Sequence, residues 1–241
     1  MVTAADAGET RTSVWLAARP AAPARRRSEA ASGLDRERIT AATVRLLDAD
    51  GLARFSMRRL AAGLGVTAMS LYWYVDTKQD LLELALDSAL GELRLPPETA
   101  ATTAGNKAAS TAGIPAGSTR APAAASAGES AGASAEAGWP GRLRVLARGY
   151  RRVLADHPWV APLTAAFPNI GPHARAFDVA LQRLLDATGL VGAARTGAHL
   201  AVSQFLHGCG GTVRRAPEGD FCLALDVVIA GIEAKARGAR G

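Results

Sequence analysis

The stretch of the 241-residue chain that decides its fold is residues 56–82, which read SMRRLAAGLGVTAMSLYWYVDTKQDLL. On both sides of Gly65 the apolar residues recur with the three- and four-residue spacing of a helix. Ser56, Thr67 and Thr77 are residue types that cap helix N-termini, and glycine is the usual left-handed residue at a helix C-terminus. The pattern predicts a helix, a tight turn at Gly65, a very short helix after Thr67 and a longer helix after Thr77. This is the layout of a helix-turn-helix, in which the second helix enters the major groove of DNA.

The helical spacing continues on both sides of this stretch and defines two blocks, residues 34–95 and 139–237. In the first block another helix precedes the helix-turn-helix and ends at Asp50-Gly51. In the second block we expect four helices and a proline-kinked stretch over 158–172. No run alternates apolar and polar residues with the period of two that a strand shows. We therefore predict an all-α fold, in which an N-terminal three-helix helix-turn-helix domain is joined to a helical C-terminal domain for ligand binding and dimerisation.

Two further segments have compositions that do not support a hydrophobic core. Residues 1–33 are rich in alanine and arginine and are predicted to be a disordered arm. The run of three arginines at 25–27 either enters the minor groove of DNA or belongs to a solvated tail with nonspecific attraction to DNA. Residues 96–138 contain 16 alanines among 43 residues and only one large aliphatic side chain, so we predict a flexible low-complexity linker.

Charge is unevenly distributed along the chain. The whole chain has a formal net charge of +6, from 28 basic and 22 acidic residues. The block over 34–95 contains 8 basic and 9 acidic residues, so it is not basic as a whole. A DNA-binding role for this block must therefore rest on individual side chains rather than on its overall charge.

The side chains that we expect to contact DNA lie on or beside the short helix after Thr67. Ser70 can donate to or accept from a base edge, and the methyl groups of Thr67 and Ala68 suit a thymine methyl. Core packing between short helices is the alternative role for Tyr72 and Trp73. The expected DNA-binding residues, some of them facing bases and others phosphates, are Ser56, Arg58, Thr67, Ala68, Met69, Ser70, Tyr72, Trp73, Tyr74 and Lys78.

Residues 34–93 resemble the TetR family of bacterial transcriptional repressors. The most specific piece is residues 71–82, LYWYVDTKQDLL, which is similar to the signature of the family. Met69 and Tyr74 depart from the proline and histidine often found at those positions, so the resemblance does not imply an operator sequence.

The resemblance implies a one-component repressor that binds a palindromic DNA operator as a homodimer and is released by a small-molecule effector. It also implies that Tyr72 and Lys78 contact the DNA backbone. A ligand-independent DNA-binding regulator is the alternative function. An enzyme that uses histidines or cysteines of the second block is a remote alternative, because His199, His207 and Cys209 do not share one helix face and no catalytic motif is present. We expect no enzymatic activity, no cofactor and no metal site.

The second block resembles the regulatory domain of TetR-type proteins from actinobacteria more weakly. Such domains enclose a small-molecule pocket and pair through their last long helices, so we place Val228 and Ile232 at a seam between two copies. The aromatic and polar residues expected to line an effector pocket are His157, Trp159, Phe167, His173, Phe177, Gln204, Phe205 and His207. Ordinary core or surface positions are the alternative for each of them.

Targeting signals and cysteine usage suggest a cytoplasmic protein. No stretch approaches the roughly 20 apolar residues that a membrane span requires. Asp6 and Glu9 stand where a secretory signal peptide has basic residues. The two cysteines, Cys209 and Cys222, do not form a metal-ligand pair, and they are consistent with a reducing compartment.

Overall fold

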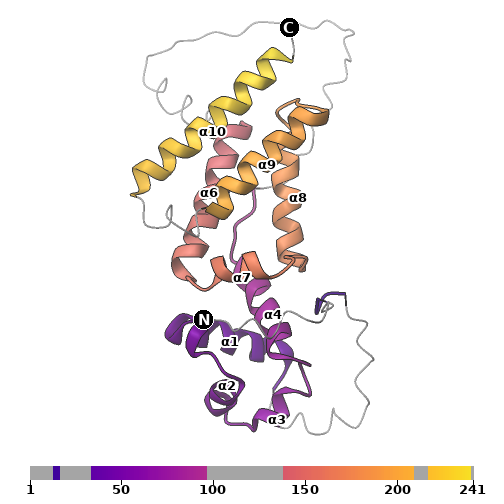
Figure 1. Cartoon of the computed structure of the whole chain (residues 1–241), viewed down its shortest axis with the longest axis vertical. Helices are drawn as coiled ribbons and strands as arrows, with labels where there is room; N and C mark the ends of the chain where they lie inside the picture. Colours follow the sequence, from indigo (N-terminus) through magenta and orange to yellow (C-terminus); the bar gives the residue numbers. More distant parts are fainter. Residues whose placement is uncertain (1–12, 17–33, 97–137, 209–216, 240–241) are drawn as a thin grey trace, which may run out of the picture.

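The computed structural model of the chain describes residues 13–16, 34–96, 138–208 and 217–239, and every regular element among them is helical. The helices form two levels (Figure 1): those of residues 34–96 make a head at one end of the molecule, and those after residue 138 make a body at the other end. The prediction of an all-α fold with a helix-turn-helix domain and a helical C-terminal domain is confirmed. No helix in the described ranges is long and apolar enough to cross a membrane.

The helix ends in the head are set by the caps that the sequence predicts. The head consists of α1 (Arg36–Asp50), the 3-10 turn η4 (Leu52–Arg54), α2 (Met57–Leu64), α3 (Ala68–Leu71) and α4 (Lys78–Leu90). The side chains of Ser56 and Thr67 each accept a hydrogen bond from the backbone N–H three residues later. Thr77 forms a capping box with Asp80, and Gly65 ends α2 with a φ of 69°.

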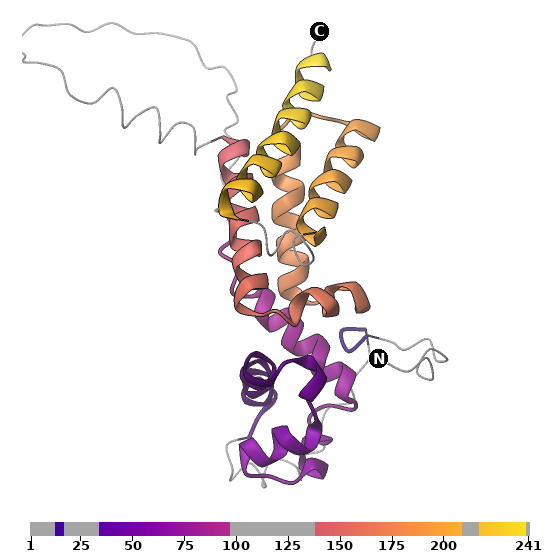
Figure 2. The same ribbon diagram turned by 60° about the vertical axis from the view of Figure 1, so that its left-hand side comes forward.

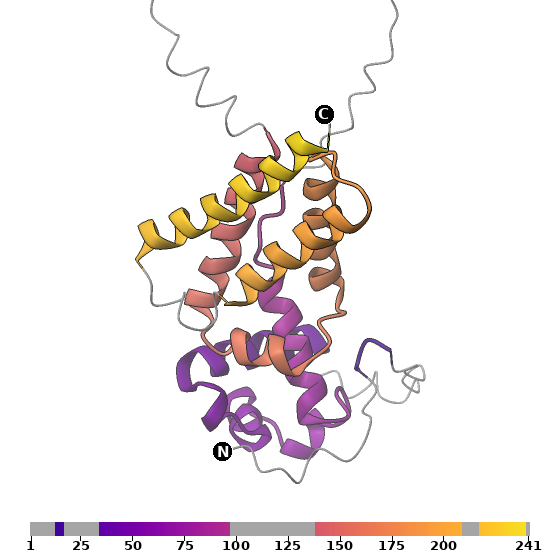
Figure 3. The same cartoon turned by 45° about the horizontal axis from the view of Figure 1, so that its top comes forward.

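The body is a layered bundle of five helices in its described part. They are α6 (Trp139–Asp156), α7 (Val160–Ala166), α8 (Pro172–Asp186), α9 (Gly192–Gly208) and α10 (Glu218–Gly238). The kinked stretch over 158–172 thus contains a short helix, α7. In the views of Figure 1 and Figure 3, α9 and α10 lie side by side and cover α6 and α8. Residues 209–214, where we expected the helix of α9 to end, lie outside the described residues.

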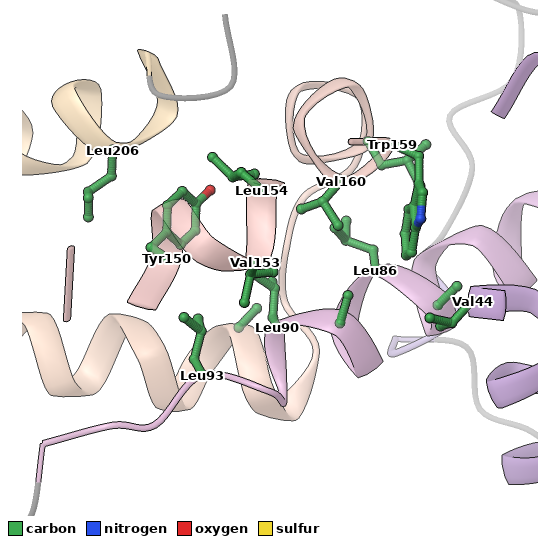
Figure 4. Close-up of a cluster of buried hydrophobic side chains, with 14 of the residues drawn as sticks. Val44, Leu86, Leu90, Leu93, Tyr150, Val153, Leu154, Trp159, Val160 and Leu206 are labelled. Atoms are coloured by element: carbon green, nitrogen blue, oxygen red, sulfur yellow. The ribbon is translucent and has the colours of Figure 1, made fainter. Parts of the chain in front are cut away.

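One continuous hydrophobic core joins the head to the body. Helix α4 packs against α1 in the head and against α6, α7 and α8 in the body, and Figure 2 shows it running from one level into the other. Figure 4 shows Leu86 and Leu90 of α4 among Val153 and Val160 of the body. One helix is therefore buried in both levels and contributes to the core of each.

Residues 13–16 differ from the expectation of a disordered arm. They form a turn in which the Leu16 N–H donates to the Ser13 carbonyl at 2.9 Å. Val14 and Trp15 pack against the core, so a short apolar run supplies burial that the average composition of the arm conceals. The rest of the predicted arm, and the predicted linker between 97 and 137, lie outside the described residues.

The apolar face of α10 points into the chain's own core. Phe221, Leu225, Ile229 and Ile232 are buried, and α10 contacts α6 and α9. Val228 is half-buried and packs against the same core. The expectation that Ile232 lies at a seam between two copies is therefore wrong, because periodicity alone does not say which neighbour covers an apolar face.

Candidate DNA-binding head and its joint with the body

Helix α3 is displayed at the far end of the head (Figure 1). Its only buried residue is Leu71, which anchors it against α2. The large side chains around this anchor project outward: the exposed fractions are 68% for Met69, 42% for Tyr72 and 46% for Trp73. Side chains of this size are rarely left exposed together without a partner, and this exposure argues against core packing as the role of Tyr72 and Trp73.

The other residues expected to contact DNA lie on α3 or beside it. Arg58 and Thr67 are exposed, whereas those that are half-buried are Ser56, Ala68, Ser70, Tyr74 and Lys78. The hydroxyls of Thr67 and Ser70 are 2.8 Å apart and share one hydrogen bond, which leaves further bonding capacity for a base or a phosphate. The Lys78 ammonium lies 5.5 Å from the centroid of the Phe55 ring, and this cation–π contact holds it at the start of α4.

Two neighbouring arginines of α2 have different surroundings. The Arg59 guanidinium lies 2.7 Å from the Asp50 carboxylate and ties α2 to the end of α1. The exposed Arg58 has no such ion pair among the described residues. Of the two, Arg58 is the residue for which the sequence predicts a phosphate contact, and that contact stays a prediction.

Two residues expected in an effector pocket, His157 and Trp159, instead join the body to the head. The Nδ1 atom of His157 lies 2.7 Å from Asp48 of α1, and its Nε2 atom lies 3.2 Å from Glu92, just after α4. The indole N–H of Trp159 donates to the same Asp48 oxygen at 2.6 Å. His157 is only 6% exposed, so this cluster, which we call the His157 joint, is a buried polar contact between the two levels.

The two carboxylates favour the charged form of His157. Burial by itself lowers the pKa of the imidazole, but the hydrogen bonds and negative charges of Asp48 and Glu92 outweigh burial and raise the pKa above its ordinary value of 6.5. A neutral imidazole has one donor and one acceptor, so only the imidazolium can donate to both carboxylates. The His157 joint is therefore strongest when His157 is protonated.

A second joint connects α4 to the start of α8. The Asp87 carboxylate accepts hydrogen bonds from the backbone N–H groups of His173 and Ala174 at 3.0–3.3 Å, and it lies 2.9 Å from the His173 Nδ1 atom. Asp87 thus caps α8 from another helix and meets the positive end of its dipole. The N-cap position itself is Gly171, where a Cβ would overlap the Asp87 carboxylate. We call this cluster the Asp87 joint.

The remaining residues expected in a pocket are dispersed over the body. Phe177 stacks on Tyr150, and Phe205 packs against Phe221. Gln204 and His207 are exposed on α9. Phe167 lines a cavity of about 10 Å³ beside α4, which is room for about one water molecule. The described structure therefore does not bring these eight residues into one cavity, and it contains no group of three metal-ligating side chains.

Sequence reasoning missed the acidic residues that make contacts between distant parts of the chain. Glu83 and Asp87 lie one helical turn apart in an otherwise apolar stretch of α4, and both are buried. Acidic residues are almost never buried without partners, so carboxylates on the apolar face of a helix are themselves a signal of a tertiary contact. The partners could not be named in advance, because they lie about 70 to 110 positions away in the sequence.

Comparison with known proteins identifies the architecture. Residues 39–85 match the family model of bacterial regulatory proteins of the tetR family. Residues 131–219 match the model of the tetracyclin repressor-like C-terminal domain, and together the two matches span more than half of the chain. The chain belongs to the TetR family. This assignment confirms both resemblances, that of the helix-turn-helix and the weaker one of the second block.

Two curated relatives are similar to this TetR-family chain over part of their length. An HTH-type transcriptional regulator from Saccharopolyspora erythraea is 34% identical over 175 residues, which are 73% of this chain and 59% of that protein. The HTH-type transcriptional repressor DrrR1 from Streptomyces coeruleorubidus is 30% identical over 138 residues, which are 57% of this chain and 38% of that protein. The chain thus spans less than two thirds of either relative.

Solved structures share the fold of this TetR-family chain. A crystal structure of ActR from Streptomyces coelicolor in complex with (S)-DNPA has a TM-score of 0.59 and 21% identity, and the match covers 84% of this chain and 98% of that chain. A structure of BioQ with its natural double-stranded DNA operator has a TM-score of 0.60 and 22% identity, over 83% of this chain and 99% of that chain. BioQ from Mycobacterium smegmatis also matches, with a TM-score of 0.57 and 23% identity, over 83% of this chain and 99% of that chain.

Proposed function

We propose that this protein is a transcriptional regulator that represses its target genes by binding a palindromic operator as a homodimer. The observation that carries the proposal is the exposure of Met69 on α3, and of Tyr72 and Trp73 directly after it, where the short helix has the cap and the buried anchor expected of a helix that reads DNA. The fold neighbour BioQ binds a double-stranded DNA operator, and the relative DrrR1 is a repressor, both of which support the proposal.

The proposed dimer uses the outer faces of α9 and α10. One stripe of exposed positions recurs with the same spacing on each helix, and all but one of the residues in the two stripes are apolar or glycine. On α9 they are Ala193, Gly197, Leu200, Ala201 and Gln204, and on α10 they are Leu223, Val227, Ala230, Gly231 and Ala234. Small residues allow helices to approach closely, so two copies of this pair can form a four-helix bundle across a two-fold axis. The two heads would then face a palindrome together.

The proposed regulation acts through α4. A small molecule bound by the body can change DNA affinity only if it binds better to one arrangement of the heads than to another. Helix α4 is held by the Asp87 joint near its end, and the His157 joint holds the segment that follows it. An effector that shifts α8 or α6 would therefore move the reading helices. The structure of ActR with (S)-DNPA shows that a fold neighbour binds a small molecule.

DNA binding is tested with sequences selected from a random pool by the wild-type protein. Tyr72→Ala and Lys78→Ala are each expected to weaken binding at least about tenfold and to reduce the slope of log affinity against log salt by about one per lost phosphate contact. Val191→Ala, at a residue of the body that is 79% exposed, is the matched control and should bind like the wild type. If both variants bind DNA with wild-type affinity, the assignment of the DNA-contacting residues to this part of the head is wrong.

A ligand-independent DNA-binding regulator is the second candidate function. It is favoured by the use of His157 and Trp159 in a buried joint rather than in a cavity. A thermal-shift screen with a library of small molecules separates the two functions, because an effector that binds the folded state raises the melting temperature by linkage. A compound that raises the melting temperature and lowers DNA affinity supports the effector-released repressor, whereas the absence of any shift supports the ligand-independent regulator.

A further inference from the structure

The N-terminal turn, residues 13–16, lies at the boundary between the head and the body (Figure 1). The Ser13 hydroxyl donates to the Glu83 carboxylate of α4 at 2.5 Å, and the Val14 N–H donates to the same oxygen at 3.2 Å. Trp15 lines the cavity beside α4 together with Leu90 and Phe167. The turn therefore contacts α4 through a charged hydrogen-bonded anchor and through an aromatic ring.

Glu83 makes this contact specific. It is only 8% exposed, and no ion pair of the described residues includes it. A buried carboxylate without a cation needs hydrogen-bond donors, because desolvation of the charge is otherwise very costly. Both donors that Glu83 has among the described residues come from the N-terminal turn, Ser13 and Val14. Without the turn, Glu83 would lose both of these donors.

We propose that the groove between α4, the end of α7 and the start of α8 is a docking surface for the chain's own N-terminal turn, and that docking restrains α4. Glu83 and Asp87 lie one turn apart on α4, and each is held by a different segment: Glu83 by the turn and Asp87 by the first residues of α8. The docked turn thus adds a second hydrogen-bonded contact to α4 beside the Asp87 joint. Docking itself does not depend on the proposed function, whereas an effect of docking on DNA affinity does.

Hydrogen–deuterium exchange of the full-length chain, without DNA or small molecules, tests the docking. Ser13→Ala removes the hydroxyl donor, and Trp15→Ala removes the ring. Each variant is expected to speed exchange of the Val14 amide by about tenfold or more, which is the scale for losing a hydrogen bond to a charged group. Exchange in the second half of α4 is expected to rise as well. Leu16→Ala is the matched control, because Leu16 belongs to the same turn but is 62% exposed. In this variant the Val14 amide and the second half of α4 should exchange as in the wild type.

Ser13→Thr distinguishes the hydrogen bond from a general loss of folding, because threonine keeps the hydroxyl and should retain protection of Val14. Unprotected exchange of Val14 in the wild type, or equal exchange in Ser13→Ala and Leu16→Ala, would overturn the docking. Since neither DNA nor effector enters the measurement, that result leaves the regulator proposal intact. Conversely, failure to bind DNA would leave the docking intact.

Discussion

At the scale of single residues, His157 is the side chain through which pH is expected to act on the protein's stability. It meets Asp48 of α1, Glu92 beyond α4 and the ring of Trp159, whose centroid lies 5.6 Å away. The first two are negatively charged and the third is neutral, so every charged group that faces the imidazole in the described structure favours its protonation. The charge of one residue therefore sets the strength of a contact between the head and the body.

We predict that the stabilisation contributed by His157 decreases as the pH rises. Because its folded-state pKa is raised above the ordinary value of 6.5, the contribution is fully present below pH 6.5 and is lost as the pH passes through the folded-state pKa. The measurement is the free energy of unfolding of the wild type and of His157→Gln between pH 5.5 and 8.5. His207→Gln, at an exposed position of α9, is the control and should show no such trend. A difference between wild type and His157→Gln that grows with pH contradicts the prediction.

Local residue signals predicted the helix ends of the head well. Ser56, Thr67, Thr77 and Gly65 act within four residues of their own position, so their caps can be read from sequence. His157 shows the opposite case: its type and neighbours suggested a pocket, but its role depends on two carboxylates 109 and 65 positions away. Sequence patterns carry information about local geometry and very little about which distant partner satisfies a buried polar group.

At the scale of elements, the start of α8 depends on a residue of α4. Gly171 stands at an N-cap position, where serine, threonine or aspartate is usual, and this absence of a capping side chain is the only local sign of a partner from elsewhere. The Asp87 carboxylate occupies the space that a side chain at 171 would need. The helix boundary was predictable, whereas the external cap required the packing of α4 on α8.

We predict that Gly171→Ala destabilises the protein by roughly 1–3 kcal/mol, the usual cost of overpacking. Gly63→Ala is the matched control, because a Cβ at that helical position of α2 meets nothing within 4 Å, and it should be neutral or stabilising by up to about 1 kcal/mol. Asp87→Ala removes the cap but also the obstacle, so the double variant should be less destabilised than the sum of the two single variants. Urea unfolding of the wild type and of the four variants measures these free-energy differences. Additive effects would show that Asp87 and Gly171 do not share one site.

At the scale of the whole molecule, the two blocks were predictable and their relation was not. Helical periodicity and composition separated residues 34–95 from 139–237, but they did not show that α4 continues the core of the head into the body. They also assigned the apolar face of α10 to a partner copy, whereas Ile232 and its buried neighbours pack within the chain. The exposed stripe on the other side of α10 escaped notice because alanine and glycine contribute weakly to an apolar pattern.

The outer stripe of α10 leads to the last prediction, that the protein is a dimer which Val227→Asp dissociates. Val227 and Leu223 are both 67% exposed, and burying such side chains at a seam contributes roughly 1.5–3 kcal/mol each. A carboxylate at 227 would lose that contribution in both copies and would be desolvated without a partner, so the dissociation constant should rise by at least about a hundredfold. Val191→Asp introduces the same charge at a valine outside the stripe and should leave the dimer unchanged. Light scattering and sedimentation at micromolar concentration measure the mass of each chain. If the wild type is a monomer, or if Val227→Asp and Val191→Asp dissociate the dimer equally, α9 and α10 do not form the dimer interface. The proposed alignment of two heads on a palindrome would then lose its basis.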